Sequence, residues 1–287
     1  MPSDEYEMSG RSFIKMHGLG NDFVVIDARD EAFTPTKDQS RLIADRRYGI
    51  GCDQFIIIEK SSKPEANAFM RIKNADGSEV GACGNATRCI ASLLMDEAEK
   101  DNVTIETLAG LLHVSKEANG LITANMGPAL LDWKDIPLAE ERDTLNTGIK
   151  LPPLRNPVCV NMGNPHAVFF VEDTEAIELE ALGPRLEHHP LFPEQANISV
   201  ASLIDENHIR LRVFERGVGI TSACGSGACA AAVASARRGL TGKKVQVDLD
   251  GGPLYIHWQE DGTVLMTGPV SKAFKGHISP ELLQLSK

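Results

Sequence analysis

The sequence predicts an α+β protein made of two similar halves, each a sheet of short strands curled around one central helix. Two observations support this prediction. Residues 71–87 and 212–228 align without a gap, and each string carries Ala-Cys-Gly followed by a helical, alanine-containing run. Each string also follows a similar succession of strand-like segments, so the whole plan occurs twice. A duplicated unit implies that the two halves are related by a pseudo-twofold axis.

The repeat extends to polar residues on both sides of the cysteines. Chance matching of short glycine-rich strings is the alternative, but ordered matches at a near-constant interval, close to half the chain, favour a duplication. In chain order the matched pairs are Gly20-Asn21 with Gly163-Asn164, Gln54 with Asn197, Asn74 with Glu215, Cys83 with Cys224, and Asn85 with Ser226.

Short apolar runs between glycine turns define the elements of the first half. Thr36 or Asp38 would cap a helix that ends near Tyr48, and Gly84 would begin a second helix that ends near Lys100. The predicted strands are 13–16, 23–27, 55–59, 69–74, 103–107, 111–116 and 121–126.

A boundary is expected at Gly127-Pro128, followed by a long connection with five prolines that ends at Pro157. The predicted halves are residues 1–127 with 270–287, which carry Cys83, and residues 128–269, which carry Cys224. The second half has a predicted helix near 176–186 and predicted strands at 158–162, 167–172, 198–203, 209–214, 245–249, 254–259 and 263–267. A last strand, 271–278, is expected to pack back on the first half.

Composition excludes several classes of function. The formal net charge is -11 and basic residues are not clustered, which argues against nucleic-acid binding. No apolar run is long enough for a membrane span, and the acidic, polar residues 1–10 are typical of a frayed tail rather than a signal peptide. We therefore expect a cytoplasmic protein. Arg46-Arg47 and Arg237-Arg238 are expected to lie on solvated helix faces.

The six cysteines are expected to be thiols in that compartment. None forms C-x-x-C and no paired histidines and cysteines suggest zinc, so no metal site is predicted. No dinucleotide fingerprint or Walker loop is present, so no cofactor is predicted either. Cys52, Cys89, Cys159 and Cys229 are interpreted as cysteines without a catalytic role.

Cys83 and Cys224 have a different setting, because each directly precedes the start of a predicted helix. The helix dipole and the exposed N–H groups of Gly84-Asn85 and Gly225-Ser226 would favour a thiolate or hold an anion there. A lone cysteine in such a turn is more often a small buried residue. Two such thiols facing one carbon from opposite sides could remove and return a proton and so invert its configuration.

The chain resembles the diaminopimelate epimerase family. The strings that carry the resemblance are M-H-G-L-G-N-D-F-V-V-I-D, G-I-G-C-D-Q, N-A-D-G-S-E-V-G-A-C-G-N-A-T-R-C, G-N-P-H-A-V and E-R-G-V-G-I-T-S-A-C-G-S-G-A-C-A. The resemblance implies a pyridoxal-independent isomerase that interconverts LL- and meso-2,6-diaminopimelate in lysine biosynthesis. It also implies two similar domains that close over the substrate, commonly in a homodimer.

The resemblance also implies residue roles. Cys83 and Cys224 correspond to the two acid/base thiols, and His166 and Glu215 to polar groups that assist their proton transfer. The residues that match substrate binders are Asn21, Gln54, Asn74, Asn164, Asn197, Glu215 and Arg216, with Gly84-Asn85 and Gly225-Ser226 as backbone cradles for the reacting carboxylate. Arg216 is expected to pair with the distal carboxylate, since a planar guanidinium suits that geometry.

Other interpretations stay open at this point. The asparagines could be turn formers, His166 a hydrogen-bonded strand residue, and Glu215 a surface charge paired with Arg216. A proline or hydroxyproline racemase would share the two-cysteine chemistry. A protein of another class, a thiol redox sensor or a non-catalytic binding protein, would use the same cysteines for a disulfide or for ligand contact.

Overall fold

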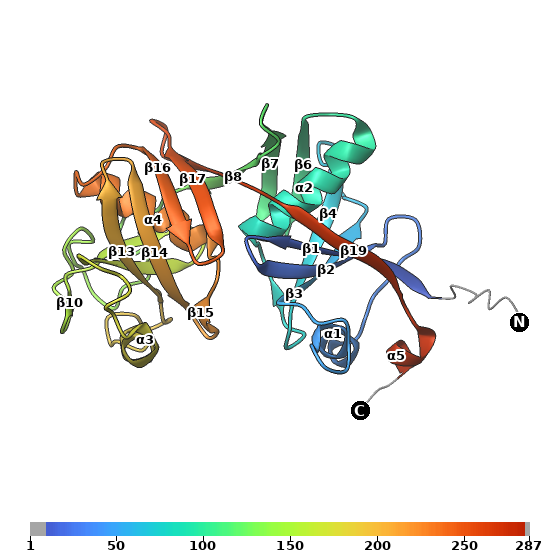
Figure 1. The fold of residues 1–287 in the computed structure, drawn as a ribbon, viewed down its shortest axis with the longest axis horizontal. Coiled ribbons are helices and arrows are strands. Elements are labelled where there is room, and N and C mark those ends of the chain that lie inside the picture. Colours follow the sequence, from blue (N-terminus) through green and yellow to red (C-terminus); the bar gives the residue numbers. More distant parts are fainter. Residues whose placement is uncertain (1–9, 285–287) are drawn as a thin grey trace, which may run out of the picture. The chain divides into compact units, whose positions relative to one another are not determined.

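The structure is a computed structural model that describes residues 10–284, so most of the predicted polar tail lies outside the described residues. Packing divides the chain into two compact units (Figure 1). Unit 1 comprises Met1–Gly18, Asp22–Lys116 and Val270–Lys287, and unit 2 comprises Leu19–Asn21 and Glu117–Pro269.

Unit 1 is a mixed sheet with a helix on each face. Alternate residues of one strand point to opposite faces, so Phe55 and Ile57 pack with Ile43 of α1, while the equally buried Ile56 faces the other side. The helices are α1 (Lys37–Ala44) and α2 (Gly84–Ala98). The strands lie in the order β19 (Ser271–Ile278), β1 (Arg11–Gly18), β2 (Asn21–Asp27), β3 (Gln54–Glu59), β4 (Ala68–Asn74), β6 (Asn102–Thr107) and β7 (Gly110–Lys116), with β5 (Glu79–Val80) beside β4.

Unit 2 curls its sheet around α4 (Gly225–Arg237), which contacts seven strands and buries ten of its residues. The small alanine side chains of α4 let the strands approach it closely. The strands lie in the order β11 (Val158–Asn161), β12 (Pro165–Phe170), β13 (Asn197–Asp205), β14 (His208–Glu215), β16 (Lys244–Leu249), β17 (Gly252–Trp258), β18 (Thr263–Gly268) and β8 (Ile122–Pro128), with β15 (Gly219–Thr221) beside β14.

The remaining elements are short. Helix α3 (Leu179–Glu187) packs on β13, β14 and β15, and α5 (Pro280–Gln284) follows β19 near α1. The hairpin β9 (Lys150–Leu151) and β10 (Leu154–Arg155) interrupts the predicted long connection.

Strand registers confirm the repeat that the sequence predicted. Ile72 lies opposite Val80 in unit 1, and their counterparts Val213 and Thr221 lie opposite each other in unit 2. Gln54 pairs in parallel with Phe23, as Asn197 does with His166. The predicted α+β class, with one central helix in each repeat, is therefore confirmed.

The compact units differ from the predicted halves at two segments. β8 pairs with β18, so residues 117–127 pack in unit 2, and the turn Leu19–Asn21 also groups with unit 2. The last strand, β19, matches its predicted bounds and pairs with β1 of unit 1. The predicted halves follow the sequence repeat, whereas the compact units follow packing. The division into residues 1–127 with 270–287 and residues 128–269 therefore stays a prediction.

Both arginine pairs differ from the predicted solvated helix faces: Arg46 and Arg47 are exposed but lie beyond α1, and Arg237 and Arg238 are half-buried at the end of α4. Helix α1 ends at Ala44, and Arg46 beyond it binds Asp22 and Asp53, each at 2.7 Å. Arg237, at the end of α4, donates to the Cys159 carbonyl in β11, and Arg238 donates to the carbonyls of Leu145 and Asn156 in the connection that precedes β11. These carbonyls need donors, and a helix C-terminus favours cations.

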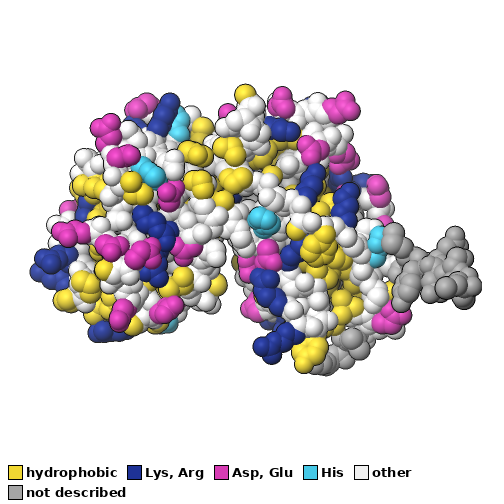
Figure 2. Space-filling model, in the orientation of Figure 1, with side chains coloured by type: hydrophobic (Ala, Val, Ile, Leu, Met, Phe, Trp, Pro, Cys, Tyr) yellow, Lys and Arg dark blue, Asp and Glu magenta, His cyan; other side chains and the backbone are white. Residues whose placement is uncertain are grey.

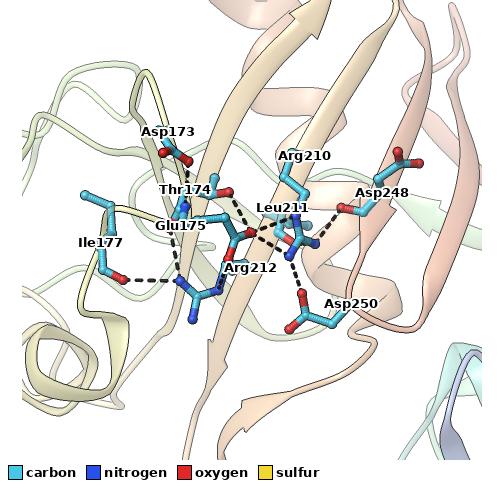
Figure 3. Close-up of polar contacts among 9 residues, drawn as sticks. All are labelled: Asp173, Thr174, Glu175, Ile177, Arg210, Leu211, Arg212, Asp248 and Asp250. Atoms are coloured by element: carbon cyan, nitrogen blue, oxygen red, sulfur yellow. Dashed lines mark hydrogen bonds and ion pairs between the residues drawn. The ribbon is translucent and has the colours of Figure 1, made fainter.

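Arg210 ties three segments of unit 2 together (Figure 3). Its Nη2 lies 2.8 Å from Glu175 Oε1, in the loop after β12, and also binds Asp250 after β16. The neighbouring Arg212 donates to the carbonyls of Thr174 and Ile177 at 3.0 and 3.2 Å. These contacts fix the loop against β14, so the cluster has a structural role.

Charged side chains of both signs are interspersed on the face in Figure 2. None of the helices in the described part of the chain is both long and apolar enough to cross a bilayer. The surface in that view therefore gives no support to a nucleic-acid interface.

The capping box of α1 gives a test of local stability. Gln39 N–H donates to Thr36 Oγ1 at 3.2 Å, and Gln39 Oε1 accepts from the Thr36 N–H at 2.8 Å. Thr36→Ala should lower the free energy of unfolding by about 1 kcal/mol, because a helix N–H loses its acceptor. Thr36→Ser, which keeps the hydroxyl, should stay close to the parent in urea denaturation; equal losses in both variants would contradict the capping role.

Candidate functional site

Cys83 is the residue that precedes α2, and its backbone is extended. Its carbonyl accepts from both the backbone N–H and the hydroxyl of Thr87, each at 2.9 Å, which fixes the first turn of the helix. The side chain is partly exposed, while Asn85 is 3% exposed. The N–H groups at Gly84 and Asn85 belong to this first turn, where they have no partner within the helix. The position of Cys83 directly before α2 matches the sequence analysis, and anion binding at Gly84-Asn85 stays a prediction.

The side chain of Arg88 bonds to the first turn of α2, and the sequence analysis did not single out this residue. Arg88 is fully buried and its Nη2 donates to Asn85 Oδ1 at 2.9 Å. Because a guanidinium can only donate, this bond turns the amide nitrogen of Asn85 outward as a donor. A Cβ at Gly18 would lie 3.1 Å from the same Nη2, so the end of β1 also packs here. The signal was available in the three-residue spacing of Asn85 and Arg88 on a helix.

Gln54 and Asn74 are neighbours across β3 and β4. Gln54 Nε2 donates to Asn74 Oδ1 at 3.0 Å, and Asn74 Nδ2 donates to Ser78 Oγ at 3.1 Å. The structure therefore brings these two predicted binding residues together in unit 1. It also shows that Asn74 closes the β4–β5 turn, so both the turn-forming and the binding interpretations remain possible for it.

Asn21 is the first residue of β2, and it groups with unit 2 together with the preceding turn residues, Leu19 and Gly20. The carbonyl of Leu19 is so close to Gly251 that a Cβ there would lie 1.9 Å from it. A Cβ at Gly20 would lie 3.6 Å from Ser222, two residues before Cys224. The turn that precedes Asn21 thus lies beside the segment leading into α4.

Cys224 caps α4 and is buried, with 3% of its surface exposed. Its Sγ accepts the Gly227 N–H at 3.4 Å and lies 3.6 Å from Ser226 Oγ. A Cβ at position 227 would lie 3.2 Å from Sγ and 3.0 Å from Val213 Cγ2. Glycine at 227 therefore lets the helix N–H reach the sulfur.

The pKa of Cys224 is raised well above its ordinary value. Burial is the main cause and the Glu215 carboxylate adds to it, while the hydroxyl of Ser226 and the Gly227 N–H act in the opposite direction. Glu215 in turn accepts a hydrogen bond from Thr221, a residue that the sequence analysis did not single out. This resting environment favours a protonated Cys224.

His166 is fully buried on β12, and burial, with a smaller contribution from the charge of Arg216, lowers its pKa to about 3. Its Nε2 lies 3.0 Å from both Asn164 Oδ1 and Ser226 Oγ. Since the Asn164 oxygen only accepts, Nε2 carries the proton. Nδ1 is then a bare, buried nitrogen with no partner among the described residues. His166 is therefore a neutral donor that links Asn164 to the cysteine end of α4.

Asn197 and Arg216 complete the predicted set in unit 2. Asn197 is buried, donates to the Pro165 carbonyl at 2.9 Å and accepts the Arg216 N–H at 2.9 Å. The Arg216 side chain is exposed and donates through Nη1 to the Glu194 carbonyl at 3.0 Å. Glu215 is partly buried, and its pairing with Arg216 stays a prediction.

The predicted site residues are therefore divided between the two units. Those in unit 1 are Cys83, Gly84, Asn85, Gln54 and Asn74; those in unit 2 are Asn21, Asn164, His166, Asn197, Glu215, Arg216, Cys224, Gly225 and Ser226. A surface pocket of about 560 Å³ in unit 2 includes none of them. It is lined by Arg210, Gln246, Asp248, Leu249, Asp250, Gly252 and Pro253.

All six cysteines lie within the described residues and are thiols. Burial raises the pKa of Cys52, Cys89 and Cys159 to about 12, and their lack of a catalytic role stays a prediction. Among the residues that the structure describes, no group of three or more His, Cys, Asp and Glu side chains is arranged to hold a metal ion.

Comparison with known proteins identifies the relatives of the chain. The family model described as diaminopimelate epimerase matches residues 13–131 and 158–273. A protein of Rhodospirillum centenum named diaminopimelate epimerase is 58% identical over 95% of this chain and 94% of its own length. One of Acidiphilium cryptum with the same name is 51% identical, over 96% of this chain and 99% of its own length.

Solved structures with low sequence identity share the fold. A Bacillus anthracis phenazine biosynthesis protein of the PhzF family has a TM-score of 0.67 and 17% identity, covering 95% of this chain and 100% of its own. A probable proline racemase from Agrobacterium radiobacter has a TM-score of 0.68 and 15% identity, covering 95% of each chain. At such identities the likeness concerns the fold alone.

The depressed pKa of His166 predicts a pH effect on stability. An unfolded histidine binds a proton below about 6.5, whereas folded His166 does so only near 3, so the unfolded state binds more protons between these values. This stabilisation is complete above pH 6.5 and is lost as the pH falls toward 3. Between pH 7.5 and pH 5 the loss should be about 2 kcal/mol.

Urea denaturation at the two pH values measures this loss. His166→Gln, which stays neutral, should lose about 2 kcal/mol less than the parent across that interval. An equal pH dependence in both proteins would show that His166 is not buried as a neutral imidazole.

The two helix-capping thiols should differ in reactivity. Iodoacetamide at neutral pH reacts with accessible thiolates, so the partly exposed Cys83 should be alkylated roughly tenfold faster or more than the buried, protonated Cys224. Peptide mass spectrometry of a time course gives both rates in one sample, and the buried Cys89 serves as an internal slow reference. Faster labelling of Cys224 would contradict the environment derived for it.

Proposed function

Because the chain belongs to the diaminopimelate epimerase family, we propose that it interconverts LL- and meso-2,6-diaminopimelate as an isomerase of lysine biosynthesis. The observation that supports this most strongly is a cysteine at the first turn of the central helix in each repeat. Relatives at 50–58% identity over nearly the whole chain bear the name of this activity.

The proposed reaction uses Cys83 and Cys224 as acid and base on one α-carbon. One sulfur, as thiolate, takes the α-proton and leaves the electron pair on carbon. The other, as thiol, donates its proton to the opposite face, so the configuration is inverted and the charge moves from one sulfur to the other. No oxidant, metal or organic cofactor is required for this balance.

Stabilisation of the carbanion is the main electrostatic demand of this reaction. The N–H groups at Gly84-Asn85 and Gly225-Ser226 would hold the α-carboxylate, into which the negative charge spreads. In this proposal Arg88 orients Asn85, and neutral His166 donates to Asn164 while its Nε2 lies 3.0 Å from Ser226 Oγ. Glu215 and burial keep Cys224 protonated, which suits it to be the proton donor when substrate arrives.

The distal end of the substrate would be read by amides and one guanidinium. Arg216 has an exposed side chain and would pair with the distal carboxylate through its planar fork. Gln54, Asn74, Asn164, Asn197 and Asn21 are proposed as the remaining binding residues. We further propose a cytoplasmic homodimer, which the family resemblance implies.

The alternative functions have less support. A proline or hydroxyproline racemase shares the fold, but those structures are only about 15% identical to this chain. A redox-sensing disulfide would need oxidation of Cys83 and Cys224. Loss of turnover on addition of reductant, rather than its recovery, would favour that alternative.

Single substitutions test the two-base proposal. Cys83→Ala and Cys224→Ala should each lower inversion of diaminopimelate by at least about a hundredfold, because each removes one of two proton-transfer groups. In deuterated water, any residual exchange should affect one stereoisomer only, and a different one in each variant, since the remaining thiol reaches one face. Proton NMR of the α-position gives exchange and inversion together.

Cys89→Ala is the matched control, because it removes a buried thiol from the same helix as Cys83. It should retain activity. Inversion that survives in either catalytic variant would remove the two-base model, and activity on proline alone would overturn the proposed substrate.

A further inference from the structure

The β4–β5 hairpin of unit 1 holds a directional chain of hydrogen bonds. The turn is closed by Asn74 and Ser78, whose backbone groups bond at 2.8 Å. Gly77 at its tip has a φ of +77°, and a Cβ there would lie 2.6 Å from the Lys37 carbonyl. The turn is therefore docked tightly on the start of α1, and its side chains have a fixed frame.

Asp76 sets the direction of this chain. Its Oδ1 accepts from the Ser78 N–H at 2.8 Å and from the Ser78 hydroxyl at 2.6 Å. An ionised carboxylate has no proton to give, and these bonds lower the pKa of Asp76, so the Ser78 hydroxyl proton points toward it. The Ser78 oxygen is then left to accept.

The directions of the next two hydrogen bonds follow from the orientation of the Ser78 hydroxyl. Asn74 Nδ2 donates to Ser78 Oγ at 3.1 Å, which leaves Asn74 Oδ1 to accept from Gln54 Nε2 at 3.0 Å. Because the side-chain nitrogen of Gln54 points toward Asn74, the side-chain oxygen of Gln54 points away from it. The terminal group of the chain is therefore Gln54 Oε1, an acceptor.

Gln54 Oε1 is buried and has no hydrogen-bond partner among the described residues. A buried acceptor without a donor is costly, and such groups are uncommon unless a ligand or a bound water supplies the donor. An amino acid at neutral pH offers one strong donor, its ammonium group. The fixed polarity of the chain therefore suits Gln54 to an ammonium and not to a carboxylate, which would need a donor there.

The second repeat keeps the hairpin without this chain. In the gapless alignment Asp76 corresponds to Gly217 and Ser78 to Gly219, and the strand register is the same. The hairpin fold thus does not require the Asp–Ser pair. Its presence in unit 1 alone points to a task of that unit.

We propose that Asp76 and Ser78 are positioning residues that orient the amides of Asn74 and Gln54, so that the enzyme selects ligands with a second ammonium group. This inference rests on the proposed function for the identity of the ligand. Neither residue needs to touch the substrate, because both act through Asn74.

Ser78→Ala and its matched control Ser78→Thr provide the test. Calorimetry would measure binding of LL-diaminopimelate and of L-2-aminopimelate, which lacks only the distal ammonium. Ser78→Ala should reduce the preference for diaminopimelate about tenfold, because the amides lose their fixed orientation. Ser78→Thr, which keeps the hydroxyl, should retain the preference. Asp76→Ala should act in the same direction as Ser78→Ala.

Steady-state kinetics separate positioning from general damage. For diaminopimelate, KM should rise in Ser78→Ala while kcat stays within about twofold, since Ser78 acts through Asn74 and not on the proposed reacting thiols. An unchanged binding preference in Ser78→Ala, or an equal loss for both ligands, would overturn this inference and leave the proposed function standing. If the parent protein preferred diaminopimelate over L-2-aminopimelate but catalysed no inversion, the proposed function would be overturned and this inference would stand.

Discussion

The rest of this structure depends on one constraint: a cysteine must stand where a strand and turn deliver the chain into a central helix. At that place the first-turn N–H groups have no partner within the helix, and they can serve a sulfur or an anion. In unit 2 the space is tight: the Gly227 N–H lies 3.4 Å from Cys224 Sγ, and a Cβ at 227 would lie 3.2 Å from that sulfur and 3.0 Å from Val213 Cγ2. The alanine-rich α4 and the sheet curled around it hold that turn rigidly.

The two repeats use this shared frame for different chemistry. Where unit 2 has His166 beside Asn197, unit 1 has Phe23 beside Gln54. Where unit 2 has Glu215 near its cysteine, unit 1 has Asn74. The titratable residues His166 and Glu215 thus belong to unit 2, and their counterparts in unit 1 are the uncharged Phe23 and Asn74. One repeat is built to adjust the protonation of its thiol, and the other to direct hydrogen bonds.

Sequence reasoning found the duplication, the helix-capping cysteines and the bounds of β19, because each depends on local patterns that repeat at a fixed interval. It placed Arg46, Arg237 and Arg238 wrongly, since their partners are carboxylates and carbonyls far away in the chain. It also missed that residues 117–127 pack in unit 2, because the pairing of β8 with β18 joins segments more than a hundred residues apart. Periodicity predicts that a segment forms a strand, but it does not predict which other strand that segment pairs with.

The starts of the paired parallel strands are held together differently in the two repeats: by carboxylates in unit 1 and by an amide side chain in unit 2. In unit 1, Asp22 and Asp53 exchange backbone-to-carboxylate bonds at 2.9 and 3.0 Å, and Lys15 and Arg46 neutralise them. Burial would raise the pKa of Asp22, but bonds from Arg46 and Lys15 outweigh it and hold the pKa well below its ordinary range.

The counterparts of these acids in unit 2 are Pro165 and Ala196, which cannot form such a clamp. There the side chain of Asn197 itself bonds the Pro165 carbonyl. One hydrogen of the Asn197 amide is thereby used within the frame, whereas the acid clamp in unit 1 makes no use of the Gln54 side chain. The ionic clamp therefore has a functional consequence: it holds the strand starts together without using the amide that the proposed ligand needs.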